Sequence, residues 1–170
     1  RGNIRAMQAA ARPFIEKALE QFPDPHLVFG HGDPCFSNIL FDKRLGLMRL
    51  IDPRGATSFE TGLMHPLYDI AKFSHSVLGG YDFINNALFT CNLNDRLALE
   101  CVPDAGGPPA WAQEAFRNRL NKAGIDVAAV RAVELSLFLS MLPLHSDRPS
   151  KLAGFALTAS AILDDLESRK

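Results

Sequence analysis

The chain has 170 residues, a net charge of −1 and a 47% share of hydrophobic residues, which fits one globular domain with a substantial core. The near-neutral charge, without a basic cluster interleaved with aromatic residues, argues against a nucleic-acid partner. No apolar run approaches the roughly 18 residues that a membrane span needs, so we expect no membrane span.

The three cysteines, Cys35, Cys91 and Cys101, include no C-x-x-C pair. Such a set is unlike a zinc site or a disulfide framework. Cys91 and Cys101 could face each other across a hairpin, but we expect reduced cysteines that fill apolar space. Reduced cysteines and a charged N-terminal stretch, unlike a signal peptide, indicate a cytoplasmic location.

The first half of the chain reads as one helix followed by short strands. Apolar residues at helical spacing predict an amphipathic helix over 3–22, kinked or effectively started by Pro13 and ended by Pro23 and Pro25. Short apolar runs predict strands at 27–29, 39–41 and 47–51, and the turn 42–46 joins the last two into a β-hairpin. Asn38 and Asp52 then lie side by side at the open end of this hairpin.

The second half reads as mainly helical. We expect a loop over 55–65, a helix over 66–78 ended by Gly79 and Gly80, a second hairpin over 87–102, and helices over about 109–123, 126–142 and 149–168. Residues 135–142 are apolar nearly all round, as in a helix that is buried on every side. The fold class is therefore α+β, mainly helical, with short β-hairpins near the front of the chain.

The polar residues around the first hairpin have the order that phosphoryl transfer requires. This reaction needs a carboxylate that orients the attacking hydroxyl, and further oxygen ligands that hold Mg²⁺ against the phosphates. Protein kinases supply an Asp, an Asn five residues later, and a second Asp across a hairpin. This chain has Asp33, Asn38 and Asp52 in that order, with His31 and Gly32 just before them. An isolated H-G-D would be explained by a turn, but the ordered set is far harder to obtain by chance.

The motif H-G-D-x-x-x-x-N-I-L at residues 31–40, followed by I-D at 51–52, closely resembles the aminoglycoside phosphotransferase and choline kinase family. These proteins are kinase-like small-molecule phosphotransferases. The motifs cover residues 28–75, and P-L-Y-D-I-A at 66–71 resembles the start of the family's downstream helix. The amino-acid sequence around these motifs also resembles a bacterial subgroup associated with capsule and surface-polysaccharide gene clusters.

The resemblance implies that 1–170 form a single kinase-like C-terminal lobe. Its catalytic loop and metal-binding hairpin would span 28–55, with the helical remainder over 63–168. The resemblance also implies an ATP- and Mg²⁺-dependent kinase that acts on a small-molecule hydroxyl, of the sugar or amino-alcohol type. Of these, a sugar or sugar-alcohol hydroxyl is our first expectation, because the C-terminal helices show no concentrated acidic face for a cationic acceptor.

Residue by residue, the resemblance implies that Asp33 is the catalytic base and that His31 braces its loop. Asn38 and Asp52 would be the Mg²⁺ ligands, and Asp69 would hold the loop backbone through hydrogen bonds. Magnesium prefers such oxygen ligands. Asp69 alone would also suit a helix start, where a carboxylate is favoured by the helix dipole.

Arg54 departs from the family, which often has an aromatic residue directly after the metal-binding Asp, where this chain has Pro53 and Arg54. Arg54 could bind a phosphate of the nucleotide or an anionic substrate, or be structural. We expect His65, His75 and His145 to be satisfied or surface residues, Trp111 and Phe116 to belong to the core, and Asp164 and Asp165 to form a solvated helix end.

Neither a nucleotide-covering Gly-rich hairpin nor a strand Lys is found in the sequence, and Lys17 and Lys72 lie in helical patterns. We therefore expect the N-terminal kinase lobe to lie upstream in the full-length protein, and this chain alone to transfer phosphate poorly. The alternative is a non-catalytic, kinase-like module that binds a ligand or a partner. A binding module has no need for Asn38 and Asp52 together, which favours the enzyme.

Overall fold

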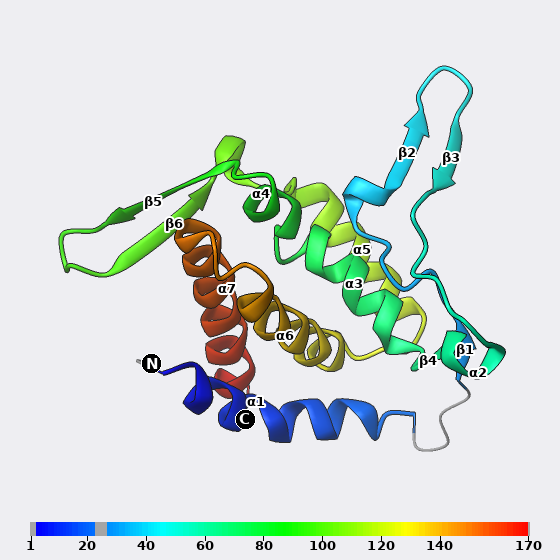
Figure 1. The fold of residues 1–170 in the computed structure, drawn as a ribbon, viewed down its shortest axis with the longest axis horizontal. Helices are drawn as coiled ribbons and strands as arrows, with labels where there is room; N and C mark the ends of the chain where they lie inside the picture. The colour runs from blue at the N-terminus through cyan, green and yellow to red at the C-terminus, as the bar shows by residue number, and fades with distance from the viewer. Residues whose placement is uncertain (1–2, 23–26, 170) are drawn as a thin grey trace.

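The computed structural model describes residues 3–22 and 27–169. Within these ranges the fold is mainly helical α+β, with small antiparallel sheets (Figure 1). Its elements are α1 (Ile4–Leu19), β1 (Val28–Phe29), the 3₁₀ turn η1 (Phe36–Asn38), β2 (Ile39–Asp42), β3 (Leu47–Leu50), α2 (Phe59–Gly62), β4 (Leu63–Met64), α3 (Leu67–Val77), α4 (Tyr81–Asn85), β5 (Phe89–Leu93), β6 (Leu99–Pro103), η2 (Asp104–Gly106), α5 (Ala110–Lys122), α6 (Val127–Leu144) and α7 (Pro149–Ser168). The predicted fold class is confirmed at this level.

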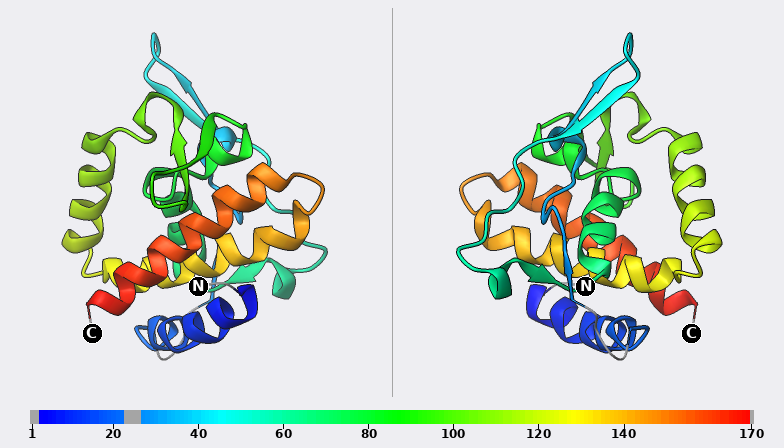
Figure 2. Two further views of the ribbon diagram at one scale, coloured as in Figure 1. Left: turned by 90° about the vertical axis from the view of Figure 1, so that its left-hand side faces the viewer. Right: turned by 90° about the vertical axis from the view of Figure 1, so that its right-hand side faces the viewer.

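Helix α6 is the centre of the core, and α1, α3 and α7 pack around it (Figures 1 and 2). Val130, Leu135 and Phe138 on α6 are fully buried, as are Phe155 and Leu163 on α7. The predicted burial of the middle helix is confirmed for most of residues 135–142, but not on every side, because Ser140 is exposed. Because α3 rests on α6, the residues that α3 presents to its other side have a fixed position.

The expectation that no apolar run reaches membrane-spanning length is wrong for α6. Its 18 residues have a mean hydropathy of 1.7, and by length and composition they would suffice to cross a membrane. A buried core helix passes the same test, and the packing of α6 against α1, α3 and α7 gives it that role in this structure.

The two predicted hairpins are present, and both project from the helical body (Figures 1 and 2). In the first, β2 pairs with β3 in the register Ile39↔Leu50 to Asp42↔Leu47. In the second, β5 pairs with β6, and Cys91 lies directly opposite Cys101. The structure joins these two cysteines in a disulfide, so the expectation of reduced cysteines is wrong for this pair and holds only for the buried Cys35. The cytoplasmic location stays a prediction and loses this part of its basis.

Several elements were not predicted from the sequence, because they form by pairing or packing with residues far away in the chain. The expected loop 55–65 contains α2 and β4, and the two residues of β4 form a strand only by pairing antiparallel with β1. Helix α4 was also missed, and α1 runs through Pro13 without starting there. Pro23 and Pro25 lie outside the described residues. Trp111 is 74% exposed, so its assignment to the core is wrong, whereas Phe116 packs against the core.

His75 on α3 is fully buried, and neither ring nitrogen has a hydrogen-bond partner among the described residues. Its ring stacks on Tyr81 at 4.3 Å between centroids and meets the edge of Phe138 at 4.0 Å. Burial, with smaller contributions from the charges of Lys72 and Arg131, holds the pKa of His75 well below its ordinary value of 6.5. The imidazole is therefore neutral in the folded protein.

We predict that His75→Phe makes the free energy of unfolding less sensitive to acid. The unfolded chain binds a proton at His75 near pH 6.5 and the folded chain does not, so this group lowers stability as the pH falls below about 6.5. Its slope is at most about 1.4 kcal/mol per pH unit, and the variant should lose that slope in urea titrations. Glu134, whose pKa is raised by burial, is unchanged in the variant, so the difference isolates His75. An equal loss of slope in the control His145→Gln would contradict the prediction.

Candidate active site

The loop over residues 30–38 is held by one carboxylate at the start of α3. Asp69 accepts a hydrogen bond from the backbone N–H of His31 at 2.6 Å and from that of Gly32 at 2.8 Å, one on each oxygen. A Cβ added to Gly30 would lie 2.5 Å from the same carboxylate, so glycine is required for this approach. The predicted role of Asp69 in loop support agrees with these contacts.

The ammonium group of Lys72 and the side-chain amide of Asn38 hold the side chain of Asp33. The Nζ atom of Lys72 lies 3.0 Å from Asp33 Oδ1, and Asn38 Nδ2 donates to Asp33 Oδ2 at 3.2 Å and to the Asp33 carbonyl at 2.9 Å. Asp33 is half-buried, and Lys72 keeps 15% of its side-chain surface exposed. The carboxylate is thus fixed in one orientation.

Sequence reasoning missed Lys72, which it had placed only in a helical pattern. The signal that could have found it is spacing: Lys72 follows Asp69 by three residues, so both lie on one face of α3. Asp69 fixes the loop backbone, and Lys72 one turn later reaches the Asp33 side chain of the same loop.

The second half of the loop is fixed by α3 and α4. Phe36 donates its backbone N–H to Ser76 Oγ at 3.1 Å. Ser37 donates its backbone N–H and its hydroxyl to Asp82 Oδ1, at 3.0 and 2.7 Å. Tertiary contacts with two helices therefore determine the path of a loop that has little regular structure of its own.

The backbone of Asn38 meets that of Ile51, the residue before Asp52, at the open end of the first hairpin. Ile51 donates its backbone N–H to the carbonyl of Asn38 at 2.9 Å, which places Asp52 next to this pair. Asp52 is exposed and has a φ of +55°, which is unusual for a residue with a side chain and often marks functional sites. The Asn38 amide oxygen and the Asp52 carboxylate accept no hydrogen bond from the described residues.

These two oxygen donors suit Mg²⁺, which commonly binds one or two protein oxygen ligands together with phosphates and water. Among the described residues, no group of three or more His, Cys, Asp or Glu side chains could hold a metal ion. The residues present therefore fit a cation shared with a phosphate-bearing ligand rather than one caged by the protein alone.

His31 braces the loop from within. Its Nδ1 accepts the backbone N–H of Asp33 at 3.3 Å, and its buried Nε2 has no partner among the described residues. This contact joins the predicted loop histidine directly to the residue that carries the candidate base.

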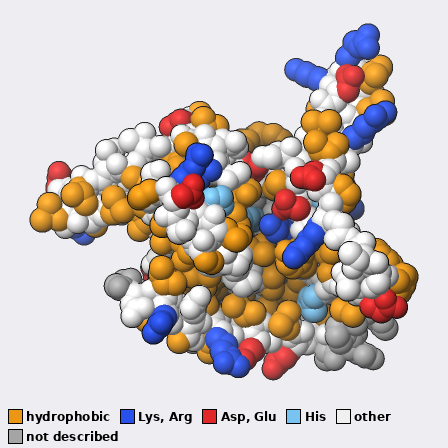
Figure 3. Space-filling view, in the orientation of Figure 1, with side chains coloured by type: hydrophobic (Ala, Val, Ile, Leu, Met, Phe, Trp, Pro, Cys, Tyr) orange, Lys and Arg blue, Asp and Glu red, His pale blue; other side chains and the backbone are white. Residues whose placement is uncertain are grey.

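Arg54 lies directly over the loop. Its backbone N–H donates to the His31 carbonyl at 2.8 Å, and its Nη1 donates to the Tyr68 hydroxyl at 3.1 Å. Gly32 has a φ of +80°, and a Cβ there would lie 2.5 Å from Arg54 Cβ, so this packing needs glycine. In the space-filling view, acidic and basic side chains gather at the base of the β2–β3 hairpin (Figure 3).

Neither Cys35 nor Tyr81 adds a nucleophile to this set. Burial, and then the charges of Asp33 and Asp82, raise the pKa of the Cys35 thiol, so it stays protonated near neutral pH. Burial, together with the neighbouring Cys35, Asp33 and Asp82, raises the pKa of Tyr81 to about 12. The remaining candidate base in this loop is the carboxylate of Asp33.

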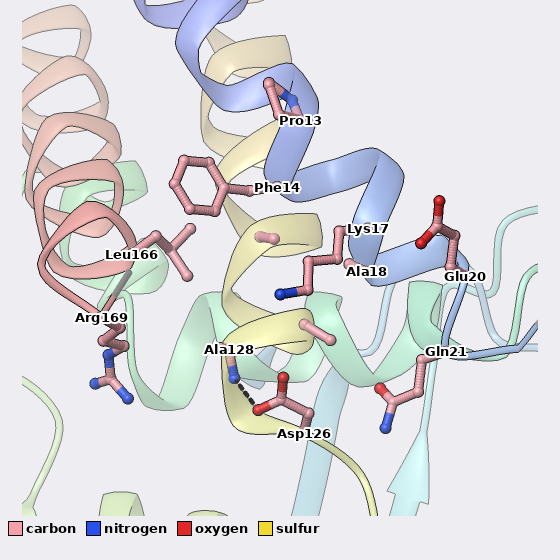
Figure 4. Close-up of a pocket in the computed structure, with 12 residues that line it drawn as sticks. Pro13, Phe14, Lys17, Ala18, Glu20, Gln21, Asp126, Ala128, Leu166 and Arg169 are labelled. Carbon is pink, nitrogen blue, oxygen red and sulfur yellow. Dashed lines mark hydrogen bonds between the residues drawn. The ribbon is translucent and has the colours of Figure 1, made fainter.

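The pocket of Figure 4 lies away from these residues, between α1, α6 and α7. It has a volume of about 670 Å³ and contains none of the predicted site residues. Asp126, at its edge, uses its carboxylate to accept the backbone N–H of Ala128 at 2.9 Å and so caps α6. The chemistry suggested by the sequence is therefore not located in this cavity.

The structure thus brings His31, Asp33, Asn38 and Asp69 into one hydrogen-bonded unit, with Lys72 as its added member. Asp52 and Arg54 lie at its border, on the segment that follows β3. Comparison with protein-family models, curated proteins and solved structures finds no match to this chain. The roles proposed below therefore rest on the residues and their geometry.

We predict that Asp69→Asn loosens the loop, because the amide nitrogen that replaces one oxygen cannot accept an N–H. The expected cost is about 1.5–3 kcal/mol in the free energy of unfolding, with faster amide hydrogen exchange at His31 and Gly32.

Asp42→Asn is the matched control. Asp42 accepts the backbone N–H groups of Arg44 and Leu45 with a single oxygen, which asparagine retains, and a change within about 0.5 kcal/mol is expected. Equal effects of the two substitutions would argue against the clamp.

Proposed function

We propose that this chain is the catalytic lobe of an ATP- and Mg²⁺-dependent phosphotransferase that acts on the hydroxyl group of a small molecule. One observation carries the proposal: the Asp33 carboxylate is fixed between Lys72 and Asn38, at the end of the hairpin that leads to Asp52. A base, an amide oxygen and a second carboxylate in this arrangement are the parts that phosphoryl transfer requires.

Each residue has a separate task in this mechanism. Asp33 orients the acceptor hydroxyl and accepts its proton as the oxygen bonds to the γ-phosphorus and the bond to the bridging oxygen breaks, with ADP as the leaving group. Lys72 and Asn38 keep the carboxylate in position. Asn38 and Asp52 would hold Mg²⁺, which neutralises charge on the phosphates when it is bound.

The surface of the first hairpin supports a second lobe as the partner that covers the nucleotide. Apolar side chains on and beside both strands are between 39% and 65% exposed; they are Leu40, Phe41, Leu45, Leu47, Met48, Leu50 and Ile51. An isolated two-stranded hairpin is marginally stable, and a contiguous apolar surface commonly marks an interaction site. An N-terminal kinase lobe from the upstream part of the full-length protein would cover this surface and contact the phosphates.

We predict that Asp33→Asn in the full-length protein lowers ATP-dependent phosphorylation of hydroxyl compounds by roughly 10²- to 10⁴-fold, because the base is lost while the shape is kept. ADP release over a panel of hydroxyl-bearing substrates measures this, with Asp104→Asn, at an exposed carboxylate outside the loop, as the control. Undiminished turnover in Asp33→Asn would refute the base assignment. No turnover with any acceptor, while ligands still bind, would favour the non-catalytic module.

Lys72→Met should reduce kcat by roughly ten- to a hundredfold, because Asp33 loses a charge-assisted partner worth about 1.5–3 kcal/mol. Lys72→Arg, which keeps the charge, should restore part of the rate. If the methionine and arginine variants are equally impaired, the positive charge is not what Lys72 contributes.

A further inference from the structure

An open pocket of about 420 Å³ lies beside the candidate base, between the segment that follows β3, helix α2 and the start of α3. Its polar lining includes Arg54, Thr57, Thr61 and Tyr68, and it contains no acidic side chain. The volume lies within the usual range for small-molecule sites. The pocket therefore combines hydroxyl groups with one positive charge.

The position of Arg54 in this pocket is built by its neighbours. Its backbone is bonded to the His31 carbonyl, its Cβ packs over Gly32, and its guanidinium donates to the Tyr68 hydroxyl at 3.1 Å. Among the described residues, no carboxylate pairs with Arg54. A guanidinium has five N–H donors in a fork that matches carboxylates and phosphates, so most of its binding capacity is unused.

The pocket adjoins the base because two contacts lie one turn apart on α3. Tyr68 holds Arg54, and Lys72, four residues later on the same face, holds Asp33. Residues at this spacing have Cβ atoms about 5–6 Å apart. Arg54 also packs over Gly32, the residue before Asp33, so a molecule bound at Arg54 lies next to the loop that carries the candidate base.

We propose that this pocket binds the acceptor, and that the acceptor is a polyhydroxylated compound with an anionic group, a carboxylate or a phosphate, which pairs with Arg54. The inference rests on the proposed phosphotransfer and specifies its substrate class. The hydroxyls of Thr57 and Tyr68 suit the remaining hydroxyl groups of such a compound, and one hydroxyl group of the compound passes its proton to Asp33 as it is phosphorylated. Cationic acceptors are disfavoured because the lining offers them a positive charge and no carboxylate.

The test uses calorimetric titration of the full-length protein, without nucleotide, with four sugars of similar size: D-gluconate, D-glucose 6-phosphate, neutral D-glucose and cationic D-glucosamine. At least one anionic probe should bind roughly tenfold or more tightly than glucose, with glucosamine weakest. Comparing the affinity for gluconate with that for glucose 6-phosphate shows whether the pocket prefers a carboxylate or a phosphate. Arg54→Gln should remove the preference and Arg54→Lys should keep part of it. Arg44→Gln, in the exposed turn after β2, should change nothing.

The proposal is overturned if neither anionic probe binds better than glucose, or if the preference survives in Arg54→Gln. It is also overturned if Arg54→Gln weakens only the binding of ATP, which would assign Arg54 to the nucleotide. ADP release is measured separately. Arg54-dependent binding of anionic sugars without turnover would support the anionic ligand and refute phosphotransfer. Turnover of a neutral or cationic acceptor that does not depend on Arg54 would support phosphotransfer and refute the anionic acceptor.

Discussion

The hydrogen bonds from the backbone of His31 and Gly32 to Asp69 are the constraint on which the rest of the site depends. Two N–H groups of a loop, each facing one oxygen of a single carboxylate, fix both the position and the orientation of that loop. The clamp is supported by the packing of α3 on α6, which buries much of the opposite face of α3. Because α3 packs on the apolar helix α6, its Asp69 holds the polar loop in a defined position.

The same helix carries the electrostatics of the site. Three residues of α3 each contact a different part of the site: Tyr68 holds Arg54, the adjacent Asp69 holds the loop backbone, and Lys72, one turn later, holds Asp33. Lys72 pairs with the half-buried Asp33 carboxylate, and Arg54 lies over the preceding residue, Gly32.

The two projecting hairpins differ in how they are stabilised. The β5–β6 hairpin is joined by the Cys91–Cys101 disulfide and packs its base on α7. The β2–β3 hairpin has no such link and exposes apolar side chains on both strands. A surface of this kind commonly marks an interaction site, whereas the disulfide-linked hairpin is supported within the described residues.

The sequence by itself determined the main helices, both hairpins, and the order of Asp33, Asn38 and Asp52, because periodicity, turn residues and spacing are local signals. It also indicated Asp69 through the motif that contains it. Only the tertiary structure decided that Lys72 reaches Asp33, that Arg54 lies over Gly32 in a pocket with Tyr68, and that β4 pairs with β1. These contacts join residues 14 to 39 positions apart, and packing around α6 rather than any local pattern brings them together.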